Sequence, residues 1–267
     1  MTFFLSSNKK AYFASDLHLT STSDEASRIR EKDFVKWLDT VKSDAGAIFL
    51  LGDIFDFWFE YRHTIPRGYV RLFGKLAELT DSGIPVHFLV GNHDQWMRNY
   101  LSEELNVNVY SEPTEFEINE KMFLIGHGHE ISPKGFVDVI FMFMFQNSFF
   151  RKLFAMLHPR WSVPFGKNWS IKKRKHRGIV DSFEGLEKEL IYRHVKNLLS
   201  KKHYDFFIFG HRHMAFDVRL NENSRYINTG EWIKEQTYAV FDGVDVEVFS
   251  NKSSMTNNKI VYDHAFR

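Results

Sequence analysis

The stretch AYFASDLHL, residues Ala11–Leu19, decides the fold. Its apolar run YFA is rich in strand formers, and Asp16 and His18 follow where that run ends. Residues i and i+2 of a strand point to the same side, so this carboxylate and this imidazole can face one site. Such a pair suits a divalent metal ion. The motif is short, and by itself it is also typical of a surface aspartate beside a structural histidine.

The same pattern recurs four times along the chain. The apolar runs AIFLL, PVHFLV, MFLI and DFFIF end in Gly52-Asp53, Gly91-Asn92-His93-Asp94, Gly126-His127-Gly128-His129 and Gly210-His211-Arg212-His213. Apolar residues at helical spacing lie between most of these runs, at 34–41, 72–79 and, as one long helix, 183–198. Strands that alternate with helices predict an α/β fold with a parallel or mixed sheet, whose sites lie at the carboxyl ends of strands.

Composition limits the classes of function. A length of 267 residues predicts one large domain or a domain with an insertion, and the net charge of +1 provides no general attraction to nucleic acid. The absence of Cys excludes disulfides and thiolate ligands, so that the 13 His and the carboxylates are the expected metal donors. The N-terminus lacks a positively charged region before an apolar run, and we therefore expect a cytoplasmic protein.

The five clusters, in this order from residue 16 to residue 213, resemble those of the calcineurin-like metallophosphoesterase superfamily. The resemblance implies that residues 1–267 form a single αββα sandwich of two mixed β-sheets flanked by helices, with two metal ions at the strand ends. One ion would be bound by Asp16, His18, Asp53 and His213. The other would be bound by Asp53, Asn92, His127 and His211, with Asp53 bridging the two.

In such a centre, two cations roughly 3.5–4 Å apart activate a water and clamp the phosphoryl oxygens for in-line attack. His93 matches the family residue that contacts phosphate and protonates the leaving oxygen. Asp94 either orients His93 or is a turn residue, and His129 either lines the site or is structural. We expect the other histidines to be structural or solvated.

Residues 130–178, between the fourth and fifth clusters, are expected to form a helical lid inserted in the domain. The first half, 136–157, is dense in Phe and Met, and its uninterrupted apolar run is far too short to span a bilayer. It predicts either a helix buried on the core or an apolar lining for an acyl chain. The second half, 167–177, is strongly basic, which is typical of phosphate contacts, of docking on an anionic membrane surface or of a solvated loop.

A narrower resemblance rests on GDIFDFWFEY (52–61), on the position of the insertion and on NTGEW (228–232). These resemble the UDP-2,3-diacylglucosamine pyrophosphatases of lipid A biosynthesis. The resemblance implies hydrolysis to UMP and 2,3-diacylglucosamine 1-phosphate with two ions, Mn²⁺ by preference, and a lid that holds the acyl chains of this amphiphilic, lipid-linked substrate. It also implies substrate contacts from Lys167, Ser170 and Arg174, and a peripheral position at the inner membrane.

Two departures keep other functions open. The best-known members of that group read GNRD and HGD, where this chain has GNHD at 91–94 and HGH at 127–129. One alternative is therefore another metallophosphoesterase, a phosphodiesterase or nuclease with a different phosphorylated substrate, although the near-neutral charge disfavours long nucleic acid. A second alternative is a metal-binding scaffold without turnover. The presence of every expected ligand and of His93 argues against it.

Overall fold

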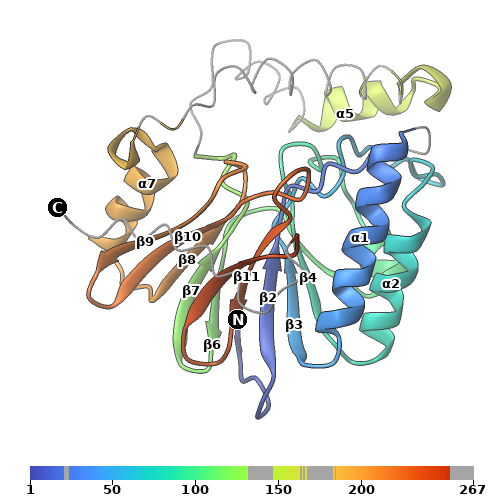
Figure 1. Ribbon diagram of the computed structural model, residues 1–267. Helices are drawn as coiled ribbons and strands as arrows, with labels where there is room; N and C mark the ends of the chain where they lie inside the picture. Colours follow the sequence, from blue (N-terminus) through green and yellow to red (C-terminus); the bar gives the residue numbers. More distant parts are fainter. Residues whose placement is uncertain are drawn as a thin grey trace.

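Two six-stranded mixed sheets form the centre of the molecule (Figure 1). The computed structural model describes residues 1–20, 24–131, 147–162, 164, 166, 183 and 185–252. One sheet contains, in spatial order, β12 (Val246–Ser250), β11 (Thr237–Phe241), β2 (Lys10–Ala14), β3 (Ala45–Leu50), β4 (Val86–Leu89) and β5 (Asn108–Tyr110). The other contains β1 (Thr2–Phe3), β6 (Thr114–Ile118), β7 (Lys121–Ile125), β8 (Phe206–Phe209), β10 (Ser224–Thr229) and β9 (Ala215–Asn221).

The alternation of side chains along the central strands explains why the two sheets stack. In β2, Ala11 and Phe13 enter the core between the sheets, whereas Tyr12 and Ala14 enter the core beneath the helices. In β8, Phe206 faces the other sheet and Phe207 faces outward against a helix. Strands that are apolar on both faces must be covered on both faces, and this requires four layers.

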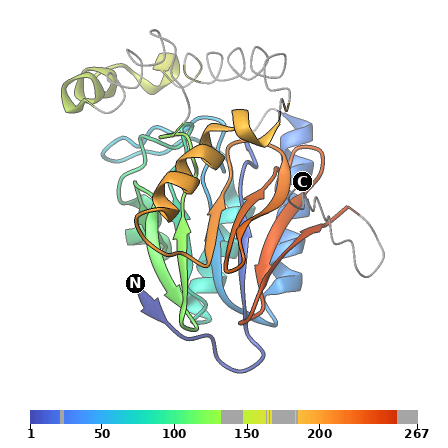
Figure 2. The same ribbon diagram turned by 90° about the vertical axis from the view of Figure 1, so that its left-hand side faces the viewer.

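Helices supply the two outer layers. α1 (Glu25–Val41) and α2 (Val70–Asp81) cover the β2–β3–β4 face, and α3 (Tyr100–Leu105) follows β4 (Figure 1). α7 (Leu190–Leu199), preceded by the short 3-10 helix η1 (Leu186–Lys188), lies across the outer face of the second sheet (Figure 2). α5 (Ser148–Ala155) lies beyond the sheet edge at which β2 and β3 end (Figure 1).

The predicted α/β fold with two mixed sheets flanked by helices is confirmed, with two differences. The single long helix predicted over 183–198 is wrong, because Glu189 has extended backbone angles and separates η1 from α7. The strands β9 and β10 were not predicted; they form an antiparallel pair with a register shift at Ser224/Arg225. Of the predicted insertion, 132–146 and most of 163–184 lie outside the described residues.

One histidine is part of the core between the sheets. The His87 ring, on β4, stacks on Phe49 at 4.6 Å between ring centroids, and its Nδ1 lies 3.0 Å from the Tyr110 hydroxyl. Burial lowers the pKa of His87 to about 4, since the charged ring would lose its hydration. The expectation that His87 is structural therefore fits its surroundings.

This burial makes stability depend on pH. As pH falls below about 6.5, the unfolded chain protonates His87 while the folded chain does not until about pH 4, so the free energy of unfolding falls with pH in that window. Between ~pH 7 and ~pH 4, the wild type should lose about 3 kcal/mol more than His87→Phe. Urea unfolding at each pH, with EDTA present, measures this difference; parallel pH profiles for the two proteins would contradict it.

Candidate metal centre

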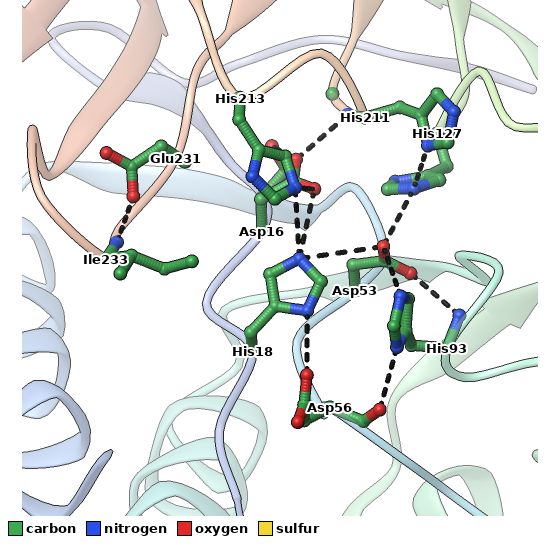
Figure 3. A network of polar contacts seen from close by, with 12 residues as sticks. Asp16, His18, Asp53, Asp56, His93, His127, His211, His213, Glu231 and Ile233 are labelled. Atoms are coloured by element: carbon green, nitrogen blue, oxygen red, sulfur yellow. Dashed lines mark hydrogen bonds and ion pairs between the residues drawn. The ribbon is translucent and has the colours of Figure 1, made fainter. Parts of the chain in front are cut away.

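Side chains from the ends of β2, β3, β4, β7 and β8 converge at one edge of the two sheets (Figure 3). Three groups have ligand atoms within 4.8 Å of one another: Asp16 with His18 and His213, Asp53 with His127 and His211, and His18 with Asp56 and His93. The predicted site residues outside the insertion thus come together. Asn92 is an amide and is not part of these groups of carboxylates and imidazoles. Carboxylates and imidazoles without thiolates suit hard-to-borderline divalent cations.

The backbone turns sharply at this edge. Five of the site residues have left-handed φ angles, which are uncommon outside glycine: Asp16 (55°), His18 (46°), Asp53 (51°), His211 (71°) and His213 (53°). Backbone hydrogen bonds hold these turns in place, such as those from the His18 N–H to the Asp53 carbonyl (2.9 Å) and from the Leu51 N–H to the Ala14 carbonyl (2.8 Å). Strained residues of this kind gather at functional sites.

Asp53 lies at the centre of the cluster. Its Oδ2 is 3.4 Å from His127 Nε2, 3.7 Å from His18 Nε2 and 3.8 Å from His93 Nε2. Its Oδ1 accepts the backbone N–H of His93 at 2.9 Å. A Cβ at Gly91 would collide with the Asp53 backbone and carboxylate, so glycine is required there for the two loops to meet. The carboxylate of Asp53 therefore faces the group that contains His18 and the group that contains His127 at once.

Hydrogen bonds and close contacts at Nδ1 turn three imidazoles inward. Nδ1 of His127 lies 2.6 Å from the Leu51 carbonyl, and Nδ1 of His93 lies 2.7 Å from the Asp56 carbonyl. Nδ1 of His18 faces the Asp56 carboxylate at 3.3 Å. Because each Nδ1 is occupied in this way, Nε2 is the atom that points into the centre, the arrangement that orients histidine ligands in metal sites.

The buried carboxylates favour positive charge at the imidazoles of His127 and His18. Burial lowers the pKa of the His127 imidazole, but the charge of Asp53 outweighs it and raises that pKa to about 10. Burial likewise opposes the charged form of His18, whose contacts with Asp16 and Asp56 raise its pKa to about 9. Burial also opposes the charge of Asp53, yet the imidazoles of His127 and His93 hold the Asp53 pKa well below its usual range. A cation placed among these groups would experience the same attraction.

Two observations test whether a metal pair fits. Among the residues that the structure describes, no donor reaches the buried Oδ1 of Asn92, whose chain neighbours Gly91 and His93 both lie against Asp53. In addition, imidazole nitrogens meet without an intervening acceptor: His18 Nε2 and His213 Nε2 are 3.1 Å apart, and His211 Nδ1 and His127 Nε2 are 3.2 Å apart. Imidazole nitrogens this close to one another, and a buried amide oxygen that no donor reaches, suit shared cations.

A second group of residues supports the centre. The Ser15 hydroxyl donates to Asp16 Oδ2 at 2.5 Å, and Asn228 donates to the Gly210 carbonyl at 2.5 Å. Arg30 on α1 donates to the His18 carbonyl at 2.9 Å. The sequence reasoning missed Ser15, Arg30 and Asp56; only the repeated Asp of GDIFD, three residues after Asp53, offered a signal.

The two uncertain neighbours have distinct surroundings. The fully buried Asp94 accepts the backbone N–H groups of Ile54 and Phe55, so it holds the loop after Asp53, and neither bond involves His93. Burial, together with the charge of Asp53, raises the pKa of Asp94 to about 7. His129 is buried beside the site, with its ring 5.5 Å from that of His127 and its Nδ1 3.2 Å from Glu130.

The described part of the insertion contacts the loops of the centre. Phe154 on α5 packs at ring-centroid distances of 4.7 Å from Phe59 and 4.6 Å from Trp96, in the segments that follow Asp53 and His93. Five other apolar side chains of this part are exposed: Phe149, Leu153, Met156, Leu157 and Trp161. The predicted substrate residues Lys167, Ser170 and Arg174 lie outside the described residues. In the part of the chain that the structure describes, no helix has the length and apolar content needed to cross a bilayer.

This chain was compared with known families, proteins and structures. Residues 9–215 match the calcineurin-like phosphoesterase family. A UDP-2,3-diacylglucosamine hydrolase of Porphyromonas gingivalis is 39% identical over 88% of this chain and 94% of its own length. A UDP-2,3-diacylglucosamine hydrolase of Vibrio atlanticus is 21% identical over 91% of this chain and 99% of its own. The E. coli phosphoesterase YfcE is 14% identical, with a TM-score of 0.45 over 90% of this chain and 92% of its own.

The family match covers all five clusters, and the fold predicted from that resemblance is the one observed. The chain belongs to the calcineurin-like phosphoesterases, and it is a metal-dependent hydrolase of that family.

Proposed function

We propose that this protein hydrolyses the diphosphate of UDP-2,3-diacylglucosamine, giving UMP and 2,3-diacylglucosamine 1-phosphate. The observation that carries the hydrolytic part is the position of the Asp53 carboxylate, which faces the ligand groups on both sides. The substrate is supported by the relative from P. gingivalis, which bears that name and shares 39% of its residues over nearly its whole length.

The proposed ligands are those that the family resemblance implies. Asp16, His18 and His213 would hold one ion, and Asn92, His127 and His211 the other, with Asp53 shared. The mixture of carboxylate, imidazole and amide donors suits Mn²⁺, which we propose as the metal. When bound, such a pair of cations activates a water and neutralises charge on the phosphoryl oxygens.

The chain's own groups would complete the reaction. Water adds to one phosphorus, the P–O–P bond breaks, and the leaving phosphate oxygen needs a proton. His93 would supply it, and this is supported by the Asp56 carbonyl, which lies against Nδ1 and leaves Nε2 directed toward Asp53. Asp56 would therefore act on two imidazoles, positioning His18 through its carboxylate and His93 through its carbonyl.

The insertion would recognise the lipid part of the substrate. We propose that 130–178 is a lid within the single domain 1–267, and that Lys167, Ser170 and Arg174 contact the phosphate and sugar. Support comes from α5 and the residues after it: Phe154 is anchored on the loops of the centre, while Leu153, Met156 and Trp161 are exposed. Arg151, Lys152 and Arg160 alternate along the chain with these apolar residues, and their charge would favour peripheral contact with an anionic lipid surface.

Replacing Asp53 tests the shared ligand. Asp53→Ala should lose both Mn²⁺ ions together and lower kcat on a generic phosphodiester by about 10³-fold or more, because one change removes a ligand from each ion. Metal content after gel filtration and Mn²⁺-dependent turnover measure these effects. Asp44→Ala is the matched control, because it removes a carboxylate at the other end of the β2–β3 pair. It should retain both ions and the wild-type turnover. Retention of two ions by Asp53→Ala would refute the shared-ligand assignment.

Replacing an exposed apolar residue of α5 tests the substrate. Leu153→Asp should raise KM for UDP-2,3-diacylglucosamine about 10-fold or more, since an acyl chain would meet a charge, while KM for a soluble phosphodiester stays unchanged. UMP release and chromogenic diester hydrolysis provide the two assays. Val244→Asp, at an exposed apolar position in the β11–β12 turn, should alter neither. Failure of the wild type to release UMP would reject this substrate and favour the alternative of another phosphoesterase.

A further inference from the structure

A buried ion pair lies directly beside the fifth cluster. Arg212, between His211 and His213, directs its guanidinium at Glu189, with Nε 2.7 Å from Oε2 and Nη2 2.7 Å from Oε1. The two side chains are only 17% and 7% exposed. Nη2 donates a hydrogen bond and Nε adds a second close ionic contact, and the two together orient the guanidinium more than one contact would.

Glu189 is itself held in place by α7. It is the residue before the first turn of this helix, but its side chain makes no capping bond to the helix and turns instead to Arg212. Ile191 and Val195, on the same helix, are buried against the outer face of the second sheet. The carboxylate that meets Arg212 therefore comes from an element fixed to the core.

The same end of α7 also contacts the fourth cluster. A Cβ at Gly128 would lie 2.6 Å from Ile191 Cδ1, so the turn that follows His127 is packed closely against the helix. Gly128 has a φ of 107°, which residues other than glycine rarely adopt. Glu189 and Ile191 thus touch the turns that carry His211, His213 and His127.

The turn at 210–213 is strained and needs support from outside. Both His211 and His213 have left-handed φ angles, and the Arg212 N–H bonds to the Gly210 carbonyl at 2.9 Å. On one side of this turn, the His211 N–H donates to Asp16 and Asn228 donates to the Gly210 carbonyl. The contact of Arg212 with Glu189 supplies a further support for this turn.

We propose that Arg212 and Glu189 are positioning residues that hold His211 and His213 in metal-binding geometry, with the first turn of α7 as their common brace. This inference rests on the metal ligands of the proposed function. Residues that orient metal ligands typically change metal affinity about 10- to 100-fold when replaced. Neither residue is among the proposed metal ligands, and both act through the backbone of the turn.

The test removes the pair without leaving a buried charge unpaired. The double variant Arg212→Met/Glu189→Met replaces both members by apolar side chains, a change that buried ion pairs often tolerate without loss of stability. We expect its Tm in EDTA to stay close to that of the wild type, while the Mn²⁺ concentration for half-occupancy rises about 10- to 100-fold. Saturating Mn²⁺ should then restore kcat to within about threefold of the wild-type value.

Arg225→Met/Asp217→Met is the matched control. It removes another ion pair from the same sheet, near the start of β10. Arg225 also pairs with Asp245, whose side chain is 55% exposed and stays hydrated when the arginine is replaced. Its Mn²⁺ affinity should stay within about twofold of the wild type. Single Glu189→Gln, which keeps an acceptor but weakens the pair, should give an intermediate loss of affinity and serves if the double variant does not fold.

Equilibrium Mn²⁺ binding separates the outcomes. Wild-type Mn²⁺ affinity in Arg212→Met/Glu189→Met would overturn the proposed positioning role. If that variant does not fold, wild-type affinity in Glu189→Gln would do so. An equal loss of affinity in the Arg225→Met/Asp217→Met control would also overturn it. His213→Ala reports on the proposed function separately: if that variant still binds two ions with wild-type affinity, the ligand assignment fails. If it loses an ion while the double variant does not, only the inference about Arg212 and Glu189 fails.

Discussion

The rest of the structure depends on one constraint, the burial of the negatively charged Asp53 where the two sheets meet. This residue is only 1% exposed. A carboxylate removed from water is costly unless positive charge surrounds it. Here the compensation comes from imidazoles on strand ends of both sheets: His18 follows β2, His93 follows β4 and His127 follows β7. The stacking of the sheets and the composition of the centre are therefore linked, since neither sheet alone could surround this carboxylate.

Much of this arrangement could be predicted because it follows from local patterns. An apolar run that ends in glycine and polar ligands identifies a strand and its carboxyl end, and five such runs place their ligands at one edge. The fold class and the convergence of Asp16, Asp53 and His127 were accessible in this way. Their roles as metal ligands remain predictions, and the expected roles of Lys167, Ser170 and Arg174 concern residues outside those described.

Other features could not be predicted because they depend on contacts between distant segments. Arg30 donates to a backbone carbonyl twelve residues away, and no side-chain pattern marks a carbonyl as an acceptor. The predicted long helix over 183–198 failed for a similar reason. Helical spacing continues through Glu189, but that residue is extended, and its carboxylate meets Arg212 rather than its own helix. Tertiary contacts outweighed local propensity at that point.

The position of α5 bears on which phosphoester the centre would cleave. Its Phe154 packs on Phe59 and Trp96, in the segments that follow Asp53 and His93, so the helix is fixed to the loops that would carry out the chemistry. Its other apolar side chains gain nothing from exposure to water. Leu153, Met156 and Trp161 are exposed, and an ester with acyl chains offers apolar surface to pack on them, which a small soluble phosphodiester does not. Exposing these apolar side chains to water is unfavourable, and an amphiphilic substrate would offset this. The exposed side chains therefore favour a lipid-linked diphosphate over a nucleic acid or a cyclic nucleotide as the substrate.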